Sequence, residues 1–320
     1  MPPCTLVSGG TGFVGRFIVE ALLAAGHGVR VMGRSPPPAG FFSGAVEFVE
    51  GSLDRPTPDP AIFEGVDGFV HAGFHHIAAR FRGGEGDDPE GFRRCNLDGT
   101  LALYSAAREA GVRRCVFLSS RAVYGRQTPG TLLAEDMEPH PDTLYGEVKL
   151  GGELALRELS DPDRFCGTSL RVTGVYGPAG PGREHKWSAI FRDFAAGAPI
   201  PPRVATEVHG EDVANAVRLV LAAPPEDVCG KLFNVSDLVL DRHDLLSLVR
   251  DVTGVASSLP ERADATSLNV MATERLAALG WRPGGIDRLR STVAELCRPL
   301  QGGHAMRNVA SGDTGDRAGG

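Results

Sequence analysis

The sequence predicts an α/β fold of the Rossmann type, with a doubly wound parallel sheet, followed by a small C-terminal α/β substrate-binding domain. Short apolar runs alternate with amphipathic segments through the first half of the chain, which is typical of a parallel sheet with crossover helices. A glycine cluster separates the first strand from the first helix, as in dinucleotide-binding βαβ units. With 320 residues, 42% of them hydrophobic, the chain can bury two cores.

The first domain is expected to span residues 1–174. Its opening unit is a strand at 4–8, a helix at 13–25 with apolar residues at helical spacing, and a strand at 29–32. Such a crossover is right-handed, and the strands that it joins are parallel. Further strands are predicted at 45–49, 68–72, 115–119 and 168–172, the last three apolar enough to be buried on both faces, with helices at 89–111 and 143–159 between them.

The second domain is expected to span residues 175–300, where Gly- and Pro-rich loops surround shorter elements. We expect helices at 187–196, 211–222, 241–252, 273–279 and 286–297, and a strand at 231–235. The stretch 207–235 is expected to return to the first domain. Residues 301–320 are Gly-rich and almost lack large apolar side chains, which predicts a disordered tail.

Charge and composition exclude several classes of partner. Asp and Glu number 40 against 33 Lys and Arg, a net charge of −7, so nucleic acids and anionic membrane surfaces are not expected partners. The six cysteines lack the paired spacing of zinc ligands, and we expect no metal site. Neither a signal-type segment nor an 18-residue apolar run occurs, which predicts a soluble cytoplasmic protein.

Three glycines form the motif GxxGxxG between the first strand and the first helix, namely Gly9, Gly12 and Gly15. Missing side chains let the backbone approach a pyrophosphate, and the helix N-terminus faces it. The alternative is a glycine turn without a ligand. At the end of the next strand, Arg34 and Ser35 stand where enzymes selecting NAD offer a carboxylate, which favours NADP over NAD. The alternative there is a solvated surface arginine.

Tyr145 and Lys149 are four residues apart in a predicted helix and so share one face. An ammonium near a phenol favours the phenolate and lowers its pKa from about 10, which suits an acid-base pair. Ser119 and Ser120 end a buried strand at the sheet edge where open α/β sheets place their sites, so a hydroxyl there can bind a substrate oxygen. The alternatives are an ordinary exposed helix face and a serine that bonds its own backbone.

Taken together, these residues resemble the extended short-chain dehydrogenase/reductase family of nucleotide-sugar epimerases, dehydratases and reductases. The resemblance covers about residues 4–298. Seven motifs recur in order: the glycine turn at 9–15, 67–73 in place of DxVxHLAA, 96–100 for NxxGT, 118–125 for SSxxVYG, 145–149 for YxxxK, 170–178 for LRxxxVYGP and 209–214 for HVDDVA.

The resemblance implies a role for each residue. Tyr145 would be the general acid or base, Lys149 would bind the nicotinamide ribose and tune the tyrosine, and Ser120 would orient the reacting hydroxyl. Asn96 would support the site, and His71, at the cofactor position of its strand, is more readily explained as a packed structural residue. Besides Tyr145 and Lys149, the implied cofactor contacts are Gly9, Thr11, Gly12, Phe13, Val14, Gly15, Arg34, Ser35, Ser52, Leu53, His71, Ala72, Gly73 and Asn96. Helices near 97–110 and 144–159 would form a homodimer interface.

The sequence also departs from the family pattern. Ser52 replaces a common aspartate at the adenine, Arg121 follows Ser120 where dehydratases carry an acidic pair, and Val148 replaces a serine with little consequence. The segment 197–209 is shortened, so Arg203 lies out of register with the family's diphosphate-binding arginine. Arg121 and Arg203 are therefore candidate contacts to a compact acidic sugar derivative. Alternatively, Arg121 points outward and pairs with an acid such as Glu135 or Asp136.

Our leading hypothesis is hydride transfer between NAD(P) and a secondary alcohol or ketone of a sugar or sugar-derived, acidic substrate. The first alternative is a nucleotide-sugar 4-epimerase with tightly held NAD(P). The second alternative is a non-catalytic sensor that binds dinucleotide and acts through a partner. Such a sensor has no need for Ser120, Tyr145 and Lys149 together.

Overall fold

The computed structural model describes residues 2–54, 58–75 and 86–310. Its main sheet has seven strands in the order β3-β2-β1-β4-β5-β6-β9, and all their pairings are parallel. The strands are β1 Cys4–Ser8, β2 Gly28–Gly33, β3 Glu47–Glu50, β4 Gly68–His71, β5 Arg114–Ser120, β6 Cys166–Val172 and β9 Leu232–Val235. The predicted Rossmann-type fold is thus confirmed.

The order of the strands reverses at β1. The chain moves outward to β2 and β3 on one side, and then crosses to β4, β5 and β6 on the other side. The last residue of β1, Ser8, pairs with Met32 on β2 and with His71 on β4. A crevice forms beyond the carboxyl ends of strands at such a switch point, and this is where open α/β sheets bind ligands.

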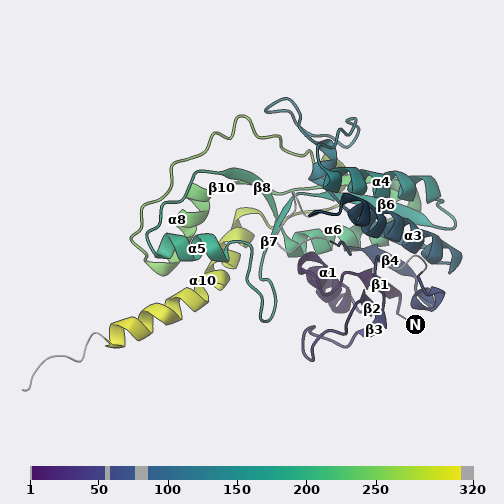
Figure 1. Cartoon of the computed structure of the whole chain (residues 1–320), viewed down its shortest axis with the longest axis horizontal. Helices are drawn as coiled ribbons and strands as arrows, with labels where there is room; N and C mark the ends of the chain where they lie inside the picture. The colour runs from purple at the N-terminus through teal and green to yellow at the C-terminus, as the bar shows by residue number, and fades with distance from the viewer. Residues whose placement is uncertain (1, 55–57, 76–85, 311–320) are drawn as a thin grey trace, which may run out of the picture.

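Helices cover both faces of this sheet (Figure 1). Successive residues of β1 show the alternation that a strand dictates: Val7 packs with the helices α1 and α6, whereas Leu6 packs with α3. The helices are α1 Phe13–Ala24 and α6 Gly210–Ala222 on the first face, and α3 Gly99–Glu109 and α4 Leu144–Leu159 on the second. Because α6 packs against α1 and β9 pairs with β6, the stretch 210–235 lies with the first sheet.

The helix expected at 89–111 is wrong in one respect, because the structure divides it. Helix α2 covers Pro89–Arg93, a π-helical turn covers Arg94–Asp98, and α3 follows. The division places Gly99 so close to the backbone of Leu53 that a β-carbon on it would lie 2.3 Å from the Leu53 carbonyl oxygen. Apolar periodicity carries no signal for such a turn.

A second, three-stranded sheet begins directly beyond β6. Its strands are β7 Gly174–Tyr176, β8 Val204–His209 and β10 Leu238–Asp241. We predicted none of them, because each is short and β8 buries the polar residues Thr206 and Glu207 instead of alternating. The helices α5 Ser188–Ala195, α8 Arg242–Thr253 and α10 Gly285–Ala310 pack with this sheet, away from α3 and α4 (Figure 1).

The remaining elements are short: 3₁₀ turns at Pro60–Phe63 and Arg121–Tyr124, and the helices α7 Pro225–Val228 and α9 Glu274–Ala278. Helix α10 runs to Ala310, past its predicted end at 297, and the disorder expected for 301–320 stays a prediction. A helix satisfies its backbone hydrogen bonds locally, so it can extend without an apolar core pattern. Residues 311–320 lie outside the described residues. None of the described helices combines the length and the apolar character that a membrane span needs.

Candidate active site

The glycine turn after β1 forms a cradle of bare backbone. Gly9 has φ +70°, and a β-carbon on it would lie 2.7 Å from the backbone of Gly73. A β-carbon on Gly15 would lie 2.1 Å from the Gly9 carbonyl oxygen, and the Gly12 amide donates to that same oxygen at 2.9 Å. The turn therefore requires glycine for close packing as well as for ligand approach.

The start of α1 is open to an anion. Among the described residues, no side chain caps its first amides at Gly12, and its first turn has no acidic residue. Unpaired amides and the helix dipole favour negative charge at such an end. Thr11, Phe13 and Val14 line this end, and Arg183 from the segment before α5 donates to the Thr11 carbonyl at 2.7 Å. These residues fit the pyrophosphate of a dinucleotide.

His71 lies fully buried beneath the turn, within a directed chain of hydrogen bonds. The Thr100 hydroxyl donates to the Asn96 carbonyl at 2.6 Å, so it accepts from His71 Nε2 at 2.8 Å. His71 Nδ1 therefore accepts from the Ser8 hydroxyl at 2.6 Å, and Ser8 in turn accepts from the Gly73 amide at 3.3 Å. Burial, with a smaller effect of Lys149, lowers the pKa of His71 to about 3. His71 is thus a neutral residue that joins β1 to β4.

The reacting end of the site is formed by β5 and α4. Thr143 caps α4 by accepting from the Gly146 amide at 3.1 Å, which places Tyr145 in the first turn beside the end of β5. There the Ser120 side chain hydrogen-bonds Tyr145 and also accepts from the Ala122 amide at 3.2 Å. Burial raises the pKa of Tyr145, and the bond from Ser120 opposes this rise. The Tyr145 ring packs edge-on against Phe74, with 5.0 Å between their centroids.

Lys149 lies one turn further along α4, on the face that carries Tyr145. Its Nζ donates to the Leu118 carbonyl at 2.7 Å, and lies 4.5 Å from the ring centroid of Phe74 and 5.9 Å from that of Tyr145. Burial lowers the pKa of Lys149 to about 7, with an opposing effect of Glu153. An amine that titrates near neutral pH can change the proton affinity of the neighbouring phenol.

Asn96 is buried in the π-helical turn and holds the backbone of His75. Its side chain donates to the His75 carbonyl and accepts from the His75 amide, both at 2.7 Å, and also donates to Phe92. The structure thus brings Asn96 to the chain that leaves β4 rather than to Tyr145. Residues 76–85, which follow His75, lie outside the described residues.

The other expected cofactor contacts lie along the carboxyl ends of the strands. Arg34 and Ser35 follow β2 and are exposed, whereas Ser52 and Leu53 follow β3 and are half-buried. Ala72 and Gly73 follow β4, where the Ala72 amide donates to Ser8. All these positions share one edge with the glycine turn, as an extended dinucleotide requires.

The two arginines proposed for substrate lie in different places. Arg121 follows Ser120 and donates to the Asn269 carbonyl at 2.9 Å; the carboxylates of Glu135 and Asp136 face Arg275 instead, at 3.7 and 3.8 Å. Arg203 lines a cavity of about 440 Å³ between α5, β8 and α8. The structure therefore does not bring Arg203 into the cluster of Ser120, Tyr145 and Lys149.

Sequence reasoning missed an ion pair between the half-buried Lys186 and the buried Glu207 in that same cavity. Glu207, 7% exposed, accepts from Lys186 at 2.5 Å, and both side chains line the cavity. The register places Glu207 opposite Gly174, two residues beyond the partner of Ser120 on β6. The pair therefore lies near the sheet edge that carries Ser120. An acidic residue in a buried strand could have signalled it.

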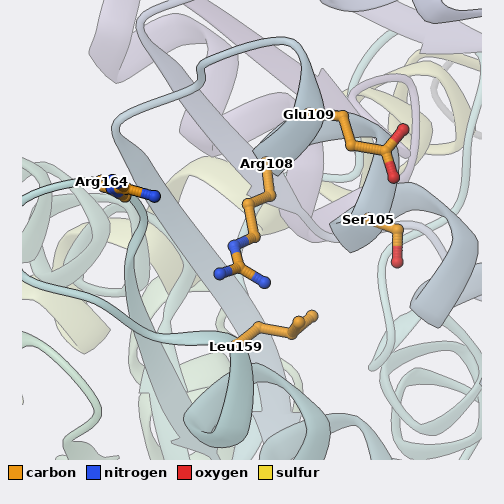
Figure 2. Close-up of a pocket in the computed structure, with 5 residues that line it drawn as sticks. All are labelled: Ser105, Arg108, Glu109, Leu159 and Arg164. Atoms are coloured by element: carbon orange, nitrogen blue, oxygen red, sulfur yellow. The ribbon is translucent and has the colours of Figure 1, made fainter.

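A smaller hollow of about 270 Å³ lies at the C-terminal ends of α3 and α4. Figure 2 shows the side chains that line it: Ser105, Arg108, Glu109, Leu159 and Arg164. Leu159 ends α4, whereas Tyr145 is in its first turn, and the 14 intervening helical steps separate them by about 21 Å. This hollow is therefore not part of the site.

Comparison with known proteins agrees with this geometry. The NAD dependent epimerase/dehydratase family model matches residues 5–236. The chain is 30% identical to UDP-glucose 4-epimerase of Corynebacterium glutamicum over 91% of this chain and 93% of that protein. It is 27% identical to D-erythronate dehydrogenase of Cupriavidus necator over 87% of this chain and 93% of that protein.

A solved structure agrees with both. UDP-glucose 4-epimerase of Thermus thermophilus, in complex with NAD, matches with a TM-score of 0.71 at 28% identity, covering 92% of this chain and 99% of that chain. The expected resemblance is confirmed, and the protein is an enzyme of this class. The chain belongs to the NAD-dependent epimerase/dehydratase family, within the extended short-chain dehydrogenases/reductases.

Proposed function

We propose that the protein interconverts a secondary alcohol and a ketone on a sugar or sugar-derived substrate, with NAD(P) as hydride carrier. The observation that carries this proposal is the cluster of Ser120, Tyr145 and Lys149 at the sheet edge that also holds the glycine turn. When bound, the nicotinamide supplies the hydride acceptor or donor. The bare backbone of the turn and the open start of α1 fit its pyrophosphate.

In this proposal, Tyr145 takes the hydroxyl proton during oxidation and returns it during reduction. Ser120, already bonded to Tyr145, holds the substrate oxygen at that position. Lys149 stabilises the phenolate through its charge, and the Leu118 carbonyl fixes its Nζ. Because Lys149 is buried beside Phe74 and Phe117, water screens its charge little and the charge acts more strongly on Tyr145.

The substrate that we favour is a compact sugar derivative with an acidic group, bound between the main sheet and the substrate-binding domain that follows it. Arg121 is fixed by Asn269 directly after the catalytic serine, and a guanidinium there suits a carboxylate. The relative named D-erythronate dehydrogenase supports this class. Arg203, in its separate cavity, would contact only the distal part of a longer substrate.

The second candidate is a nucleotide-sugar 4-epimerase, which the relatives named UDP-glucose 4-epimerase favour. One screen separates the two: sugar acids, lactones, free sugars and nucleotide sugars, each with NAD and with NADP. Net formation or consumption of reduced cofactor with a sugar acid supports the dehydrogenase. An epimerised nucleotide sugar, with cofactor retained through purification and not consumed, supports the epimerase. A cellular phenotype that persists in Tyr145→Phe with unchanged dinucleotide binding would instead support a sensor.

We also propose that NADP is preferred to NAD, on the strength of Arg34 at the end of β2. The family is described as NAD dependent and the solved relative is in complex with NAD, so the measurement compares NADP with NAD. Losing one charge-assisted contact to the 2′-phosphate costs about 1.5 to 3 kcal/mol. Arg34→Ala should therefore weaken NADP(H) about tenfold or more and NAD(H) far less. Equal losses, or tighter binding of NAD(H) by the wild-type protein, would refute the preference.

We further propose a homodimer that pairs through α3 and α4. Leu154, on α4, is 46% exposed and lies on one of the two helices that would pair. Light scattering after size-exclusion chromatography should give twice the mass of one chain. The variant Leu154→Asp should give the mass of a single chain. A cytoplasmic location agrees with the six free cysteines.

A further inference from the structure

Three consecutive residues at the end of β5 hold three successive turns of α4. The Leu118 carbonyl accepts from Lys149 at 2.7 Å, and the Ser120 side chain bonds Tyr145. Between them, the Ser119 hydroxyl donates to Glu153 at 2.5 Å. Glu153 is thus bound to the strand in the same way as the two proposed active-site residues, one turn beyond Lys149.

Glu153 is also bound from the neighbouring strand. Arg171 lies opposite Ser119 in the register of β5 and β6, and its Nε and Nη2 donate to the Glu153 carboxylate at 3.0 and 2.7 Å. Arg171 is 1% exposed and Glu153 3% exposed, so water does not screen the pair. The Arg171 guanidinium also lies over the Tyr124 ring, at 4.6 Å from its centroid.

A buried pair of this kind contributes little net stability, because desolvation offsets the attraction between the charges. Here it lies against a third buried charge. Glu153 is four residues after Lys149 on one helix face, which is about 5–6 Å between β-carbons. Among the described residues, Tyr145 on the same helix and the neutral His71 on β4 also lie near Lys149, and Arg171 on β6 is bound to the Glu153 carboxylate.

We propose that Glu153 is a positioning residue that keeps Lys149 protonated, and that Arg171 limits this effect by neutralising part of the Glu153 charge. The hydrogen bond from Ser119 holds the Glu153 carboxylate in one position, so its effect on the charge of Lys149 is constant. Without Glu153, Lys149 and Arg171 would be two like charges in one dry layer, and Lys149 would lose its proton. The effect on catalysis rests on the proposed function, in which Tyr145 and Lys149 act together. The effect on the charge of Lys149 does not depend on the proposed function.

The test measures the proton affinity of Lys149 directly. The chain has three lysines, Lys149, Lys186 and Lys231, so protein labelled with ¹³C at lysine Cε gives three resonances to titrate. An opposite charge within about 4 to 6 Å of a titrating group shifts its pKa by about one unit or more. Glu153→Gln should lower the pKa of Lys149 by that amount, and Arg171→Gln should raise it. Lys186 and Lys231 should titrate unchanged in both variants, which makes them internal controls.

Opposite shifts are a result that a general structural defect would not give. Unchanged titration of Lys149, or shifts in the same direction, would overturn the proposal. A single variant with an unpaired buried charge can fail to fold. The double variant Glu153→Gln with Arg171→Gln leaves neither Glu153 nor Arg171 without its partner, and should lower the pKa of Lys149 because the charge that acts on Lys149 directly is Glu153. A value equal to that of the wild type would likewise overturn the proposal.

The titration needs no substrate, so it separates this inference from the proposed function. If the opposite shifts occur and no turnover is ever found, the proposed function fails and the charge balance stands. If turnover is found, the pH at which kcat/KM falls on the alkaline side, where Lys149 loses its proton, should move with Lys149: downward in Glu153→Gln and upward in Arg171→Gln. An alkaline limb that does not move in these variants would refute the catalytic part.

Discussion

Acidification should destabilise this protein between pH 6.5 and pH 3, and His71 should be a major cause. Its pKa is lowered from the usual 6.5 to about 3, because the imidazole is fully buried and near Lys149. In that interval the unfolded chain binds a proton that the folded chain does not, so the free energy of unfolding falls as the pH falls. Stability from this group is complete above pH 6.5 and lost towards pH 3.

The magnitude follows from the distance between the two pKa values. At pH 5 the unfolded imidazole is about 1.5 units below its pKa, while the folded one remains neutral, so the loss is about 2 kcal/mol relative to pH 7. Protonation would also oblige the ring to donate from both nitrogens, which breaks its bond from the Ser8 hydroxyl. Because Ser8 also holds Gly73, the glycine turn should loosen together with the fold.

The assay is urea unfolding at pH 7 and pH 5 for the wild-type protein and for His71→Gln, which keeps a donor and an acceptor but does not titrate. The variant is less stable at pH 7, but should lose about 2 kcal/mol less on acidification. His209, whose pKa is lowered to about 4 by burial, and the carboxylates act in both proteins and cancel in the difference. Equal losses in the two proteins, or a larger loss in His71→Gln, would refute the neutral, structural role of His71.

Two further predictions concern the cofactor cradle and the active-site lysine. Gly15→Ala should weaken dinucleotide binding about a hundredfold, because its new methyl would lie 2.1 Å from the Gly9 carbonyl oxygen. Gly28→Ala is the control and should bind dinucleotide normally, because its new methyl would lie 3.8 Å from the nearest atom. Equal affinities of the two variants in calorimetry would contradict this prediction. Lys149→Met should abolish turnover. Because burial lowers the pKa of Lys149 from 10.5 to about 7, the same variant should stabilise the fold at pH 7 by about 2 to 4 kcal/mol. A loss of stability in urea unfolding would contradict this prediction.

Local patterns in the sequence predicted the main sheet well. The opening unit is strongly periodic, and α1 at Phe13–Ala24 and α4 at Leu144–Leu159 each match their predicted bounds within one residue. The second sheet was missed because β7 has three residues and because Glu207 in β8 is buried by an ion pair with Lys186, 21 residues away. Pairing between distant residues leaves no trace in a local period.

The same distinction holds within the active site. The spacing of Tyr145 and Lys149 on one helix face is local, and so it could be read from the sequence. The hydrogen-bond chain through His71 joins β1, β4 and α3, and the Glu153–Arg171 pair joins α4 to β6. Both depend on which strands are neighbours, which the motifs alone do not specify.

The central claim is that Tyr145 transfers the proton while dinucleotide is bound at the glycine turn. It is tested most directly by comparing the wild-type protein with Tyr145→Phe in two measurements, NAD(P)H affinity by fluorescence titration and turnover of the best substrate from the screen. We predict the same affinity within about twofold and a turnover about 10²- to 10⁴-fold lower in Tyr145→Phe, the range for loss of a general acid or base. Turnover equal to that of the wild-type protein, at equal affinity, would contradict the claim.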